Sequence, residues 1–374
     1  MHFHLIVTDE CNLCCSYCRA KAFEETGTQG PEEDAVEIDP ELPVELSFDL
    51  AGLYEFLGKD PSPTLTFYGG EPLLRADLVE EIMQRAPGRF MIQTNGLLLD
   101  RLPPGIVNRF STILLSIDGP EGLTDAHRGN GTYRAVTGAA GKIRSRGYTG
   151  ELIARMTVNE DTDIVSSVLW LAENPDFSFS SIHWQIDANF SRDYQARSFG
   201  EWVTKSYNPG IRTLVSRWVD HMEATGKVLR WYPFLDPVDD LLHERSTRLR
   251  CGSGYANYSI MTDGNIAPCP VMTGMSGYYV GHISDADPLQ LPTVEIGGEC
   301  RTCGILGFCG GRCLYSNITE PWGPEERRTV CSSVENLHGA LSGVLPRIRD
   351  LISDGVIRWT DFSHEKFNGC EIIP

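Results

Sequence analysis

The sequence predicts an α/β protein in which a partial (β/α)6 TIM-type barrel is followed by a small cysteine-rich domain. Two observations lead to this prediction. Over the first 190 residues, short apolar runs alternate with amphipathic segments, and after residue 251 this pattern gives way to sequence rich in glycine and cysteine. A chain of 374 residues is long enough for one large domain and a smaller one.

Short apolar runs of β type mark the strands of the predicted barrel. They lie at residues 3–8, 65–68, 90–94, 113–117, 152–158 and 182–186. Amphipathic segments with helical spacing lie between them, at residues 48–57, 76–85, 133–146 and 163–173. Strand and helix in alternation imply parallel pairing with right-handed crossovers. Because a closed barrel needs about eight such units, we expect a partial barrel or open sheet with its chemistry at the carboxyl ends of the strands.

The predicted domain division follows the change in composition. Residues 1–190 are assigned to the barrel, 191–250 to a helical linker and 251–374 to the cysteine-rich domain. In the linker, several large apolar side chains recur at helical spacing and are interpreted as core: Trp202, Leu214, Trp218 and Met222. A last helix is expected at Val334–Ile352.

Composition excludes several classes of function. The formal net charge of −19 argues against binding to nucleic acid. No apolar run is long enough to span a membrane, and the N-terminus lacks the pattern of a secretion signal. We therefore expect a cytoplasmic protein with no membrane partner. In that compartment the twelve cysteines are better interpreted as metal ligands than as disulfides.

The first group of cysteines is Cys11, Cys15 and Cys18, with Cys14 between them. It follows the first predicted strand directly. Three close thiolates suit an iron–sulfur cluster whose fourth iron has no protein ligand, and an open iron can bind a small molecule. A zinc site that uses all four thiols is the structural alternative. Since neighbouring thiols point in different directions, Cys14 is interpreted as a bystander.

This group resembles the signature of the radical S-adenosylmethionine (SAM) superfamily, Cys-x3-Cys-x2-Cys after strand one. The resemblance places Tyr17 near the adenine of SAM. It also matches Gly69-Gly70-Glu71-Pro72, after the second strand, to the motif that binds the methionine amino group. Physically, two glycines permit close backbone approach, and a carboxylate pairs with an ammonium group. Without that position, the motif is equally compatible with a turn.

Polar residues near the later strands resemble further SAM-contacting positions of that superfamily: Asn95, Ser116, Asp118, Arg128 and Arg155. The two arginines are candidates to pair with the methionine carboxylate. A structural ion pair is the alternative for either of them. No side chain is assigned as a catalytic acid or base.

The second group of cysteines spans the last third of the chain. It consists of Cys251, Cys269 with Gly264 five positions before it, Cys300, Cys303, Cys309, Cys313 and Cys331. The spacing resembles the SPASM subfamily of radical SAM enzymes, which carries two auxiliary 4Fe–4S clusters. The resemblance assigns one cluster to Cys300, Cys303, Cys309 and Cys331, and the other to Cys251, Cys269 and Cys313.

The second of these auxiliary clusters lacks a fourth cysteine, because no thiol lies between Cys251 and Cys269. Two explanations stay open. The iron is either free to bind a substrate thiolate, or it is closed by Cys370 or by a group that is not a cysteine.

The resemblance implies an anaerobic enzyme with three 4Fe–4S clusters, one of which binds SAM and two of which are auxiliary. Reductive cleavage of SAM gives a 5′-deoxyadenosyl radical, which abstracts hydrogen from a peptide or protein. Formation of a thioether or another crosslink on a ribosomal peptide is our first hypothesis. Pro270 follows Cys269 where the sulfatase-maturing branch has an acidic residue, so that reaction is less favoured.

The expected partners are the peptide substrate and a low-potential electron donor such as ferredoxin or flavodoxin. The chain begins directly on the first strand, so recognition of any leader peptide is expected to use either a separate leader-peptide-binding protein or the chain's own surface. Two alternatives are kept. One is radical SAM oxidation of a small molecule or carbohydrate. The other is a non-catalytic iron–sulfur electron-transfer or zinc-binding protein, which would need neither the Gly69–Pro72 motif nor an open iron.

Overall fold

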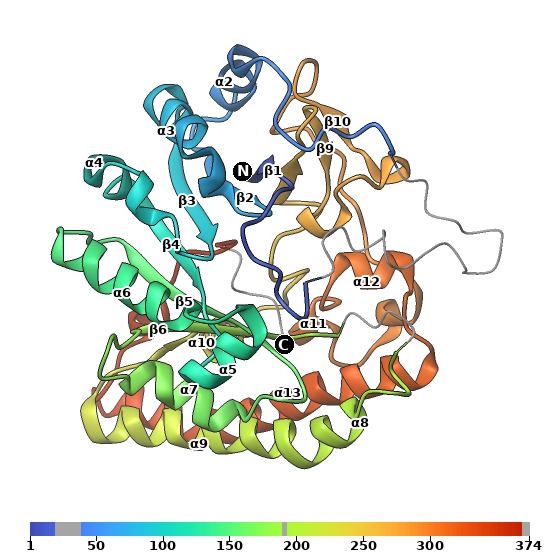
Figure 1. Ribbon diagram of the computed structural model, residues 1–374. Helices are drawn as coiled ribbons and strands as arrows, with labels where there is room; N and C mark the ends of the chain where they lie inside the picture. Colours follow the sequence, from blue (N-terminus) through green and yellow to red (C-terminus); the bar gives the residue numbers. More distant parts are fainter. Residues whose placement is uncertain (19–38, 189–192, 369–374) are drawn as a thin grey trace. The chain divides into compact units, whose positions relative to one another are not determined.

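The computed structural model describes residues 1–18, 39–188 and 193–368 (Figure 1). The chain forms two compact units, and each is assembled from segments that are distant in the sequence. The first unit consists of residues 1–117, 124–153 and 252–295, and the second of 118–123, 154–251 and 296–374. The linear division at residues 190 and 250 stays a prediction.

A parallel sheet forms the centre of the first unit. Its neighbouring strands are β1 (His2–Thr8), β2 (Thr64–Gly69), β3 (Arg89–Thr94) and β4 (Phe110–Ser116). Six of the seven residues of β1 are buried. Such runs of adjacent buried residues are typical of parallel strands with both faces covered. The prediction of an α/β fold with a parallel sheet is confirmed.

Helices follow the strands of this unit as the alternation predicted. They are α2 (Leu50–Gly58), α3 (Ala76–Arg85), α4 (Pro104–Val107) and α6 (Thr132–Ser145). Another helix, α5 (Glu121–Arg128), begins in the second unit and ends in the first. The predicted helix at residues 76–85 has the same bounds in the structure. The residues of its apolar stripe are buried: Leu78, Val79, Ile82 and Met83. This burial explains why the helical periodicity could be recognised in the sequence.

The sheet has strands that the sequence analysis did not expect. They are β8 (Asn257–Ile260), β9 (Asn265–Ala267) and β10 (Gly281–His282). β8 pairs in parallel with β1, and β9 pairs antiparallel with both β8 and β10. At the junction with β1, His4 Nδ1 and Asn257 Oδ1 are 3.0 Å apart and buried. Part of the glycine- and cysteine-rich segment therefore extends the sheet.

Gly264 makes the turn between β8 and β9. Its φ is +94°, and an added Cβ would lie 2.7 Å from the His282 ring. The Gly264 N–H donates to the Met261 carbonyl at 3.0 Å, as expected for a tight turn. The glycine of the Gly-x4-Cys pattern is thus required by the hairpin, and β9 leads from it toward Cys269.

The second unit combines short strands with long helices. β5 (Glu151–Val158) begins in the first unit and ends here, and β6 (Ser181–Ile186) pairs in parallel with β7 (Arg230–Trp231). The helices are α7 (Ile164–Glu173), α8 (Phe199–Trp202), α9 (Asn208–Thr225), α10 (Tyr232–Leu242), α11 (Leu306–Cys309), α12 (Leu314–Thr319) and α13 (Pro324–Ser353).

Helices α9 and α13 lie side by side along this unit (Figure 1). The apolar stripe predicted as core is buried: Trp202 is 6% exposed, and Leu214, Trp218 and Met222 are fully covered. The Trp218 indole N–H donates to the Leu229 carbonyl at 2.8 Å, so its polar atom is satisfied.

The last helix is longer than the sequence analysis predicted. α13 begins at Pro324 rather than at Val334. Proline is favoured at the first position of a helix, because its missing N–H would have no partner there and its φ is already helical. The consequence is that Cys331 lies on the helix and not before it. Among the described residues, no helix is both long enough and apolar enough to cross a bilayer.

Candidate functional site

The loop that carries Cys11, Cys15 and Cys18 is held at the end of β1 by the backbone of the Gly-Gly-Glu motif. The Gly70 N–H donates to the Thr8 carbonyl at 2.8 Å, and the Glu71 N–H donates to the Glu10 carbonyl at 2.8 Å. A Cβ at Gly69 would lie 2.2 Å from the Thr8 carbonyl oxygen, and one at Gly70 would lie 2.2 Å from that of Glu10. Both glycines are therefore required for the loop to pack against β2.

Glu71 is almost fully buried, with 1% of its surface exposed. One carboxylate oxygen accepts from the Thr94 hydroxyl at 2.7 Å and from the Leu73 N–H at 3.0 Å. The other accepts from the Asn95 N–H at 2.8 Å. Burial raises the pKa of Glu71, and these three hydrogen bonds act in the opposite direction. The side chain therefore joins the end of β3 to the motif, which is a structural role in addition to the predicted one.

Asn95 continues this connection back to the cysteine loop. Its side-chain amide donates to the Asn12 side-chain oxygen at 2.7 Å. Burial raises the pKa of Cys11, and this is the larger effect. Two hydrogen bonds lower the pKa: one with the Asn95 side chain, and one from the Leu13 N–H, which lies 3.5 Å from the Cys11 Sγ. Asn95 was predicted as a site residue from the sequence, but Asn12 was not, because a single asparagine among cysteines forms no pattern that indicates a role.

Tyr17 is held by the end of α5. The His127 ring meets it edge-on at 5.4 Å between centroids, and the Arg128 guanidinium carbon lies 5.3 Å from its ring centroid. The backbone supports this contact, because the Ser16 N–H donates to the His127 carbonyl at 2.8 Å. The structure thus brings two predicted residues, Tyr17 and Arg128, into contact, with His127 as a third that the sequence analysis missed.

The remaining predicted SAM contacts lie on the later strands or shortly after them. Ser116 is the last residue of β4 and is half-buried. Asp118 is fully buried and accepts from the Thr157 N–H at 3.0 Å. Arg155 on β5 donates to the Gln185 side-chain oxygen at 2.9 Å and lies 3.1 Å from His183 Nδ1. These residues stay predicted SAM contacts.

The donor set of the first cysteine group fits an iron–sulfur cluster. Cys11, Cys15 and Cys18 come from one short loop, and the Cys18 N–H donates to the Cys15 carbonyl at 3.0 Å. Cys14 is exposed. Among the described residues, no three His, Cys, Asp or Glu side chains lie close enough to share a single metal ion, and no disulfide is formed.

A second set of thiols lines one cavity in the second unit, here named the cysteine pocket. The cysteines that line it are Cys300, Cys303, Cys309, Cys313 and Cys331. Burial raises the pKa of Cys309 to about 11 and also raises those of Cys300 and Cys331. Uncharged thiols are thus favoured without a metal. A donor set of this kind, soft and gathered in one cavity, fits an iron–sulfur cluster.

Short elements bring these thiols together. Cys309 ends α11, Cys313 precedes α12 and Cys331 lies on α13. Gly310 closes α11 with φ +69°, and a Cβ there would lie 2.1 Å from the Arg248 carbonyl oxygen. The predicted set of Cys251, Cys269 and Cys313 is divided between the units, so that assignment stays a prediction. Cys370 lies outside the described residues.

The family described as the radical SAM superfamily matches residues 5–163. That stretch contains the first cysteine group, the Gly-Gly-Glu motif and the ends of the first five strands. It therefore also contains the contacts around Glu71 and Tyr17. The similarity to the radical SAM superfamily thus covers this N-terminal part of the chain.

Curated relatives of this chain include proteins with several different names. An uncharacterized protein of Archaeoglobus fulgidus is 24% identical over 82% of the chain and 72% of its own length. The AdoMet-dependent heme synthase of Nitratidesulfovibrio vulgaris is 30% identical, over 40% of the chain and 39% of its own length. A probable GTP 3′,8-cyclase of Methanosarcina mazei is 32% identical, over 36% of the chain and 35% of its own length. These two named relatives are thus matched over less than half of their length.

Solved structures of similar fold cover much more of the chain. The structure of histidine-tagged anSMEcpe with bound AdoMet has a TM-score of 0.69 at 18% identity, and the match covers 95% of this chain and 97% of that one. Streptococcus suis SuiB bound to S-adenosylmethionine has a TM-score of 0.55 at 17% identity, covering 87% of this chain and 75% of that one. At these identities the likeness is one of fold.

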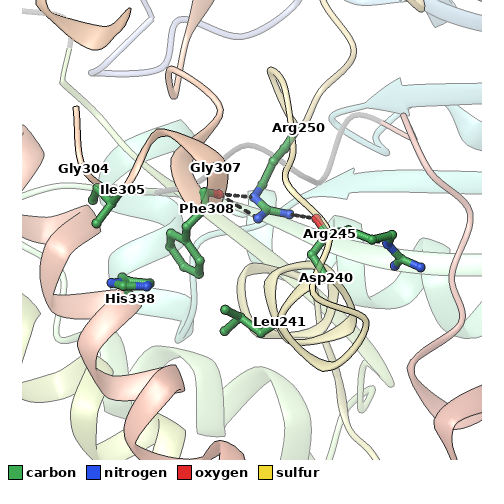
Figure 2. Close-up of a pocket in the computed structure, with 9 residues that line it drawn as sticks. All are labelled: Asp240, Leu241, Arg245, Arg250, Gly304, Ile305, Gly307, Phe308 and His338. Carbon is green, nitrogen blue, oxygen red and sulfur yellow. Dashed lines mark hydrogen bonds and ion pairs between the residues drawn. The ribbon is translucent and has the colours of Figure 1, made fainter. Parts of the chain in front are cut away.

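A buried charge network lies beside Cys251 and Cys309, two members of the second cysteine group. The Arg250 guanidinium donates twice to the Phe308 carbonyl, at 3.0 and 2.7 Å, and to the Asp240 carboxylate at 2.8 Å (Figure 2). It also pairs with Asp236. Since Arg250 precedes Cys251 and Phe308 precedes Cys309, the network fixes the backbone next to two predicted ligands. Arg250, Asp240 and Phe308 also line a cavity of about 190 Å³.

The same network holds the end of the described chain. Asp236 accepts from Lys366 at 2.9 Å and lies 3.1 Å from the His364 ring. Burial opposes ionisation of Asp236, but the His364 hydrogen bond and the Arg250 charge hold the pKa of its carboxyl well below the usual range. The sequence analysis did not find this network, because its members lie in segments that are distant in sequence.

We predict that Gly70→Ala destabilises the first unit. The added Cβ meets the Glu10 carbonyl oxygen at 2.2 Å, so the cysteine loop must shift. Overpacking of this kind costs about 1–3 kcal/mol of unfolding free energy. Thermal unfolding of the metal-free protein checks this. The control is Gly52→Ala on α2, where the new methyl group meets nothing within 4 Å. That variant should keep or slightly raise the melting temperature. Equal melting temperatures for the two variants would contradict the requirement for glycine at position 70.

We also predict that Arg250→Met is strongly destabilising, because it leaves Asp236 and Asp240 buried without their main cation. Loss of one partner of a buried ion pair costs about 3–5 kcal/mol. The matched control is Arg347→Met, whose pairs with Asp220 and Glu223 are exposed, so a loss of about 0–1 kcal/mol is expected. Denaturant unfolding of the metal-free variants measures both values, and a cost below that of the control would show that Arg250 is not needed.

Proposed function

We propose that this chain is a radical SAM enzyme of the SPASM type that modifies a peptide or protein. The observation that carries the proposal is the cysteine pocket, in which five of the seven cysteines of the second group line one cavity. An enzyme that needed only the SAM-binding cluster would have no use for this second set of clustered thiols. The spacing of all seven cysteines supports the same assignment.

In this proposal the first cysteine group holds the cluster that binds SAM through its open iron. When bound, cluster and SAM together supply the 5′-deoxyadenosyl radical. The chain's own part is to position and shield. Gly69 and Gly70 hold the cysteine loop against β2, and their close approach leaves backbone carbonyls as candidate acceptors for the methionine ammonium. The Glu71 carboxylate adds negative charge beside that position while its buried hydrogen bonds keep it in place.

Aromatic and cationic side chains complete the proposed SAM site. Tyr17, fixed by His127 and Arg128, offers a flat surface for the adenine. Arg128 is 6% exposed, and its guanidinium is the proposed partner of the methionine carboxylate. Asp118, Ser116 and Asn95 are proposed to contact the polar parts of SAM from the ends of β4 and β3.

A peptide is the proposed substrate class, with a low-potential ferredoxin or flavodoxin as electron donor. The solved structures of similar fold include anSMEcpe with bound AdoMet and a Cp18Cys peptide, and SuiB bound to its precursor peptide SuiA. The likeness to anSMEcpe extends over 92% of the chain and so includes the C-terminal region. We propose thioether or other crosslink formation, since an iron without a cysteine ligand in the second auxiliary cluster would suit a substrate thiolate.

The alternative is a small-molecule substrate, as the names heme synthase and GTP cyclase indicate for two relatives. Their matches cover 40% and 36% of this chain, an extent comparable to the matched radical SAM domain. That domain supplies chemistry common to peptide and small-molecule enzymes. The similarity therefore favours neither substrate class, and the cysteine pocket favours the peptide.

The cluster assignment predicts about twelve irons per chain after anaerobic reconstitution. Replacing Cys11, Cys15 and Cys18 together by alanine should lower this to about eight irons. It should also abolish 5′-deoxyadenosine formation from SAM and dithionite, because the open iron is lost. The matched control is Cys14→Ala, which should keep iron and cleavage. About four irons in the unmodified chain, or bound zinc in their place, would contradict three clusters.

The substrate assignment predicts that the reconstituted enzyme modifies a short cysteine-containing peptide encoded near its gene. With SAM and reductant, thioether formation should remove the mass of two hydrogen atoms from the peptide and yield 5′-deoxyadenosine. Mass spectrometry detects both products. Alkylating the peptide cysteine beforehand should prevent the mass loss. Consumption of a porphyrin or nucleotide, with the peptides unchanged, would favour the alternative.

A further inference from the structure

Arg312 differs from the other cation that lines the cysteine pocket. Arg327 is paired with Glu299 at 3.2 Å and with Glu320 at 3.4 Å. The Arg312 guanidinium makes no ion pair and no side-chain hydrogen bond within residues 1–18, 39–188 and 193–368, and its Nε is buried. An arginine without a carboxylate partner is unexpected in a chain with a formal net charge of −19. Its charge is therefore available to whatever fills the pocket.

The backbone at Arg312 is strained in a way that a different residue would relieve. Its φ is +57°, and the preceding Gly310 and Gly311 have φ of +69° and +93°. Left-handed backbone is unfavourable for a side chain with a Cβ and is readily adopted by glycine or asparagine. A third glycine would make this turn more easily. The Arg312 side chain therefore occupies this position at a conformational cost.

The guanidinium is held in place by an aromatic ring. Its carbon lies 5.4 Å from the Trp322 ring centroid, a cation–π contact. Trp322 is itself anchored, because its indole N–H donates to the Ala188 carbonyl at 2.8 Å. Trp322 also lines the cysteine pocket. The ring supports the cation without neutralising it, as a carboxylate would.

Arg312 lines the same cavity as the four thiols assigned to one cluster, those of Cys300, Cys303, Cys309 and Cys331. A cluster held by four thiolates carries net negative charge, and one-electron reduction by a low-potential donor adds another negative charge. In a partly buried pocket a fixed cation stabilises that charge more than it would in water. Nearby charge is one of the ways in which proteins set the potential of such clusters.

We propose that Arg312 is the counter-cation of the cluster bound by Cys300, Cys303, Cys309 and Cys331, and that it raises the reduction potential of this cluster. Arg312 acts through its charge and not through hydrogen bonds, since its position is fixed by the turn at Gly310–Gly311 and by Trp322. The proposal rests on the proposed function, which supplies the cluster. Arg312 is a positioning and tuning residue and touches no substrate in this proposal.

The test compares Arg312→Lys and Arg312→Asn. Lysine keeps the charge, whereas asparagine removes it and tolerates the left-handed backbone. Both are made in a full-length parent chain in which Cys11, Cys15, Cys18, Cys251 and Cys269 are alanine, so that only the cysteine pocket keeps its complete set of ligands. After reconstitution the parent should bind about four irons. A redox titration followed by electron paramagnetic resonance then gives the midpoint potential of this cluster.

The potential should shift to a more negative value in the asparagine variant and stay close to the parent in the lysine variant. Iron should also be lost to a chelator several-fold faster from the asparagine variant. Failure of only the asparagine variant to load iron supports the proposal too. An unchanged potential with asparagine, or equal shifts or equal iron loss in both variants, overturns it. A parent chain that binds no iron overturns the cluster assignment itself, and with it this inference.

Discussion

The N-terminal half of the structure depends on one close backbone contact. β2 ends against the first residues of the cysteine loop, and the two chain segments approach so closely that neither Gly69 nor Gly70 has room for a Cβ. This contact determines where the loop starts, and therefore where Cys11 can lie. The buried Glu71 carboxylate accepts a hydrogen bond from the Asn95 N–H at the end of β3. The Asn95 side chain in turn donates to Asn12 in the cysteine loop, so β3 also helps to fix the loop. The loop is thus fixed by neighbouring strands rather than by structure of its own.

The second unit holds its cysteines by different means. Short elements carry the thiols, and the residues around them are joined largely by polar and charged contacts. Arg250 ties the segment before Cys251 to the segment before Cys309 through the Phe308 carbonyl. Asp236 and Asp240 fix that guanidinium, and Lys366 adds a second cation. A segment rich in glycine and cysteine has few apolar side chains to bury, so buried charge pairs contribute more to its stability.

In the proposed function, the chemistry and the substrate class rest on different parts of the chain. The radical SAM match covers residues 5–163, and two relatives whose names indicate small-molecule products match 40% and 36% of the chain. The proposed role of residues 5–163 is to hold a cluster and SAM at the ends of parallel strands, whatever molecule receives the radical. The fold likeness to anSMEcpe extends over 95% of the chain. The peptide proposal therefore depends on residues after the domain, and above all on the cysteine pocket.

The sequence by itself determined the parallel α/β fold and most of its barrel elements, because buried strands and amphipathic helices leave a periodic pattern in a single segment. The predicted strand at residues 3–8 and the helix at 76–85 agree with β1 and α3. Cysteine spacing likewise identified the candidate ligands, since thiols on one loop are close in sequence. Only the tertiary structure decided the rest. β8 is a strand because β1 offers it a free edge, Gly70 is required because Glu10 lies against it, and Arg312 faces thiols that arrive from separate helices. Each of these depends on a neighbour that is distant in sequence, and no local pattern encodes that neighbour.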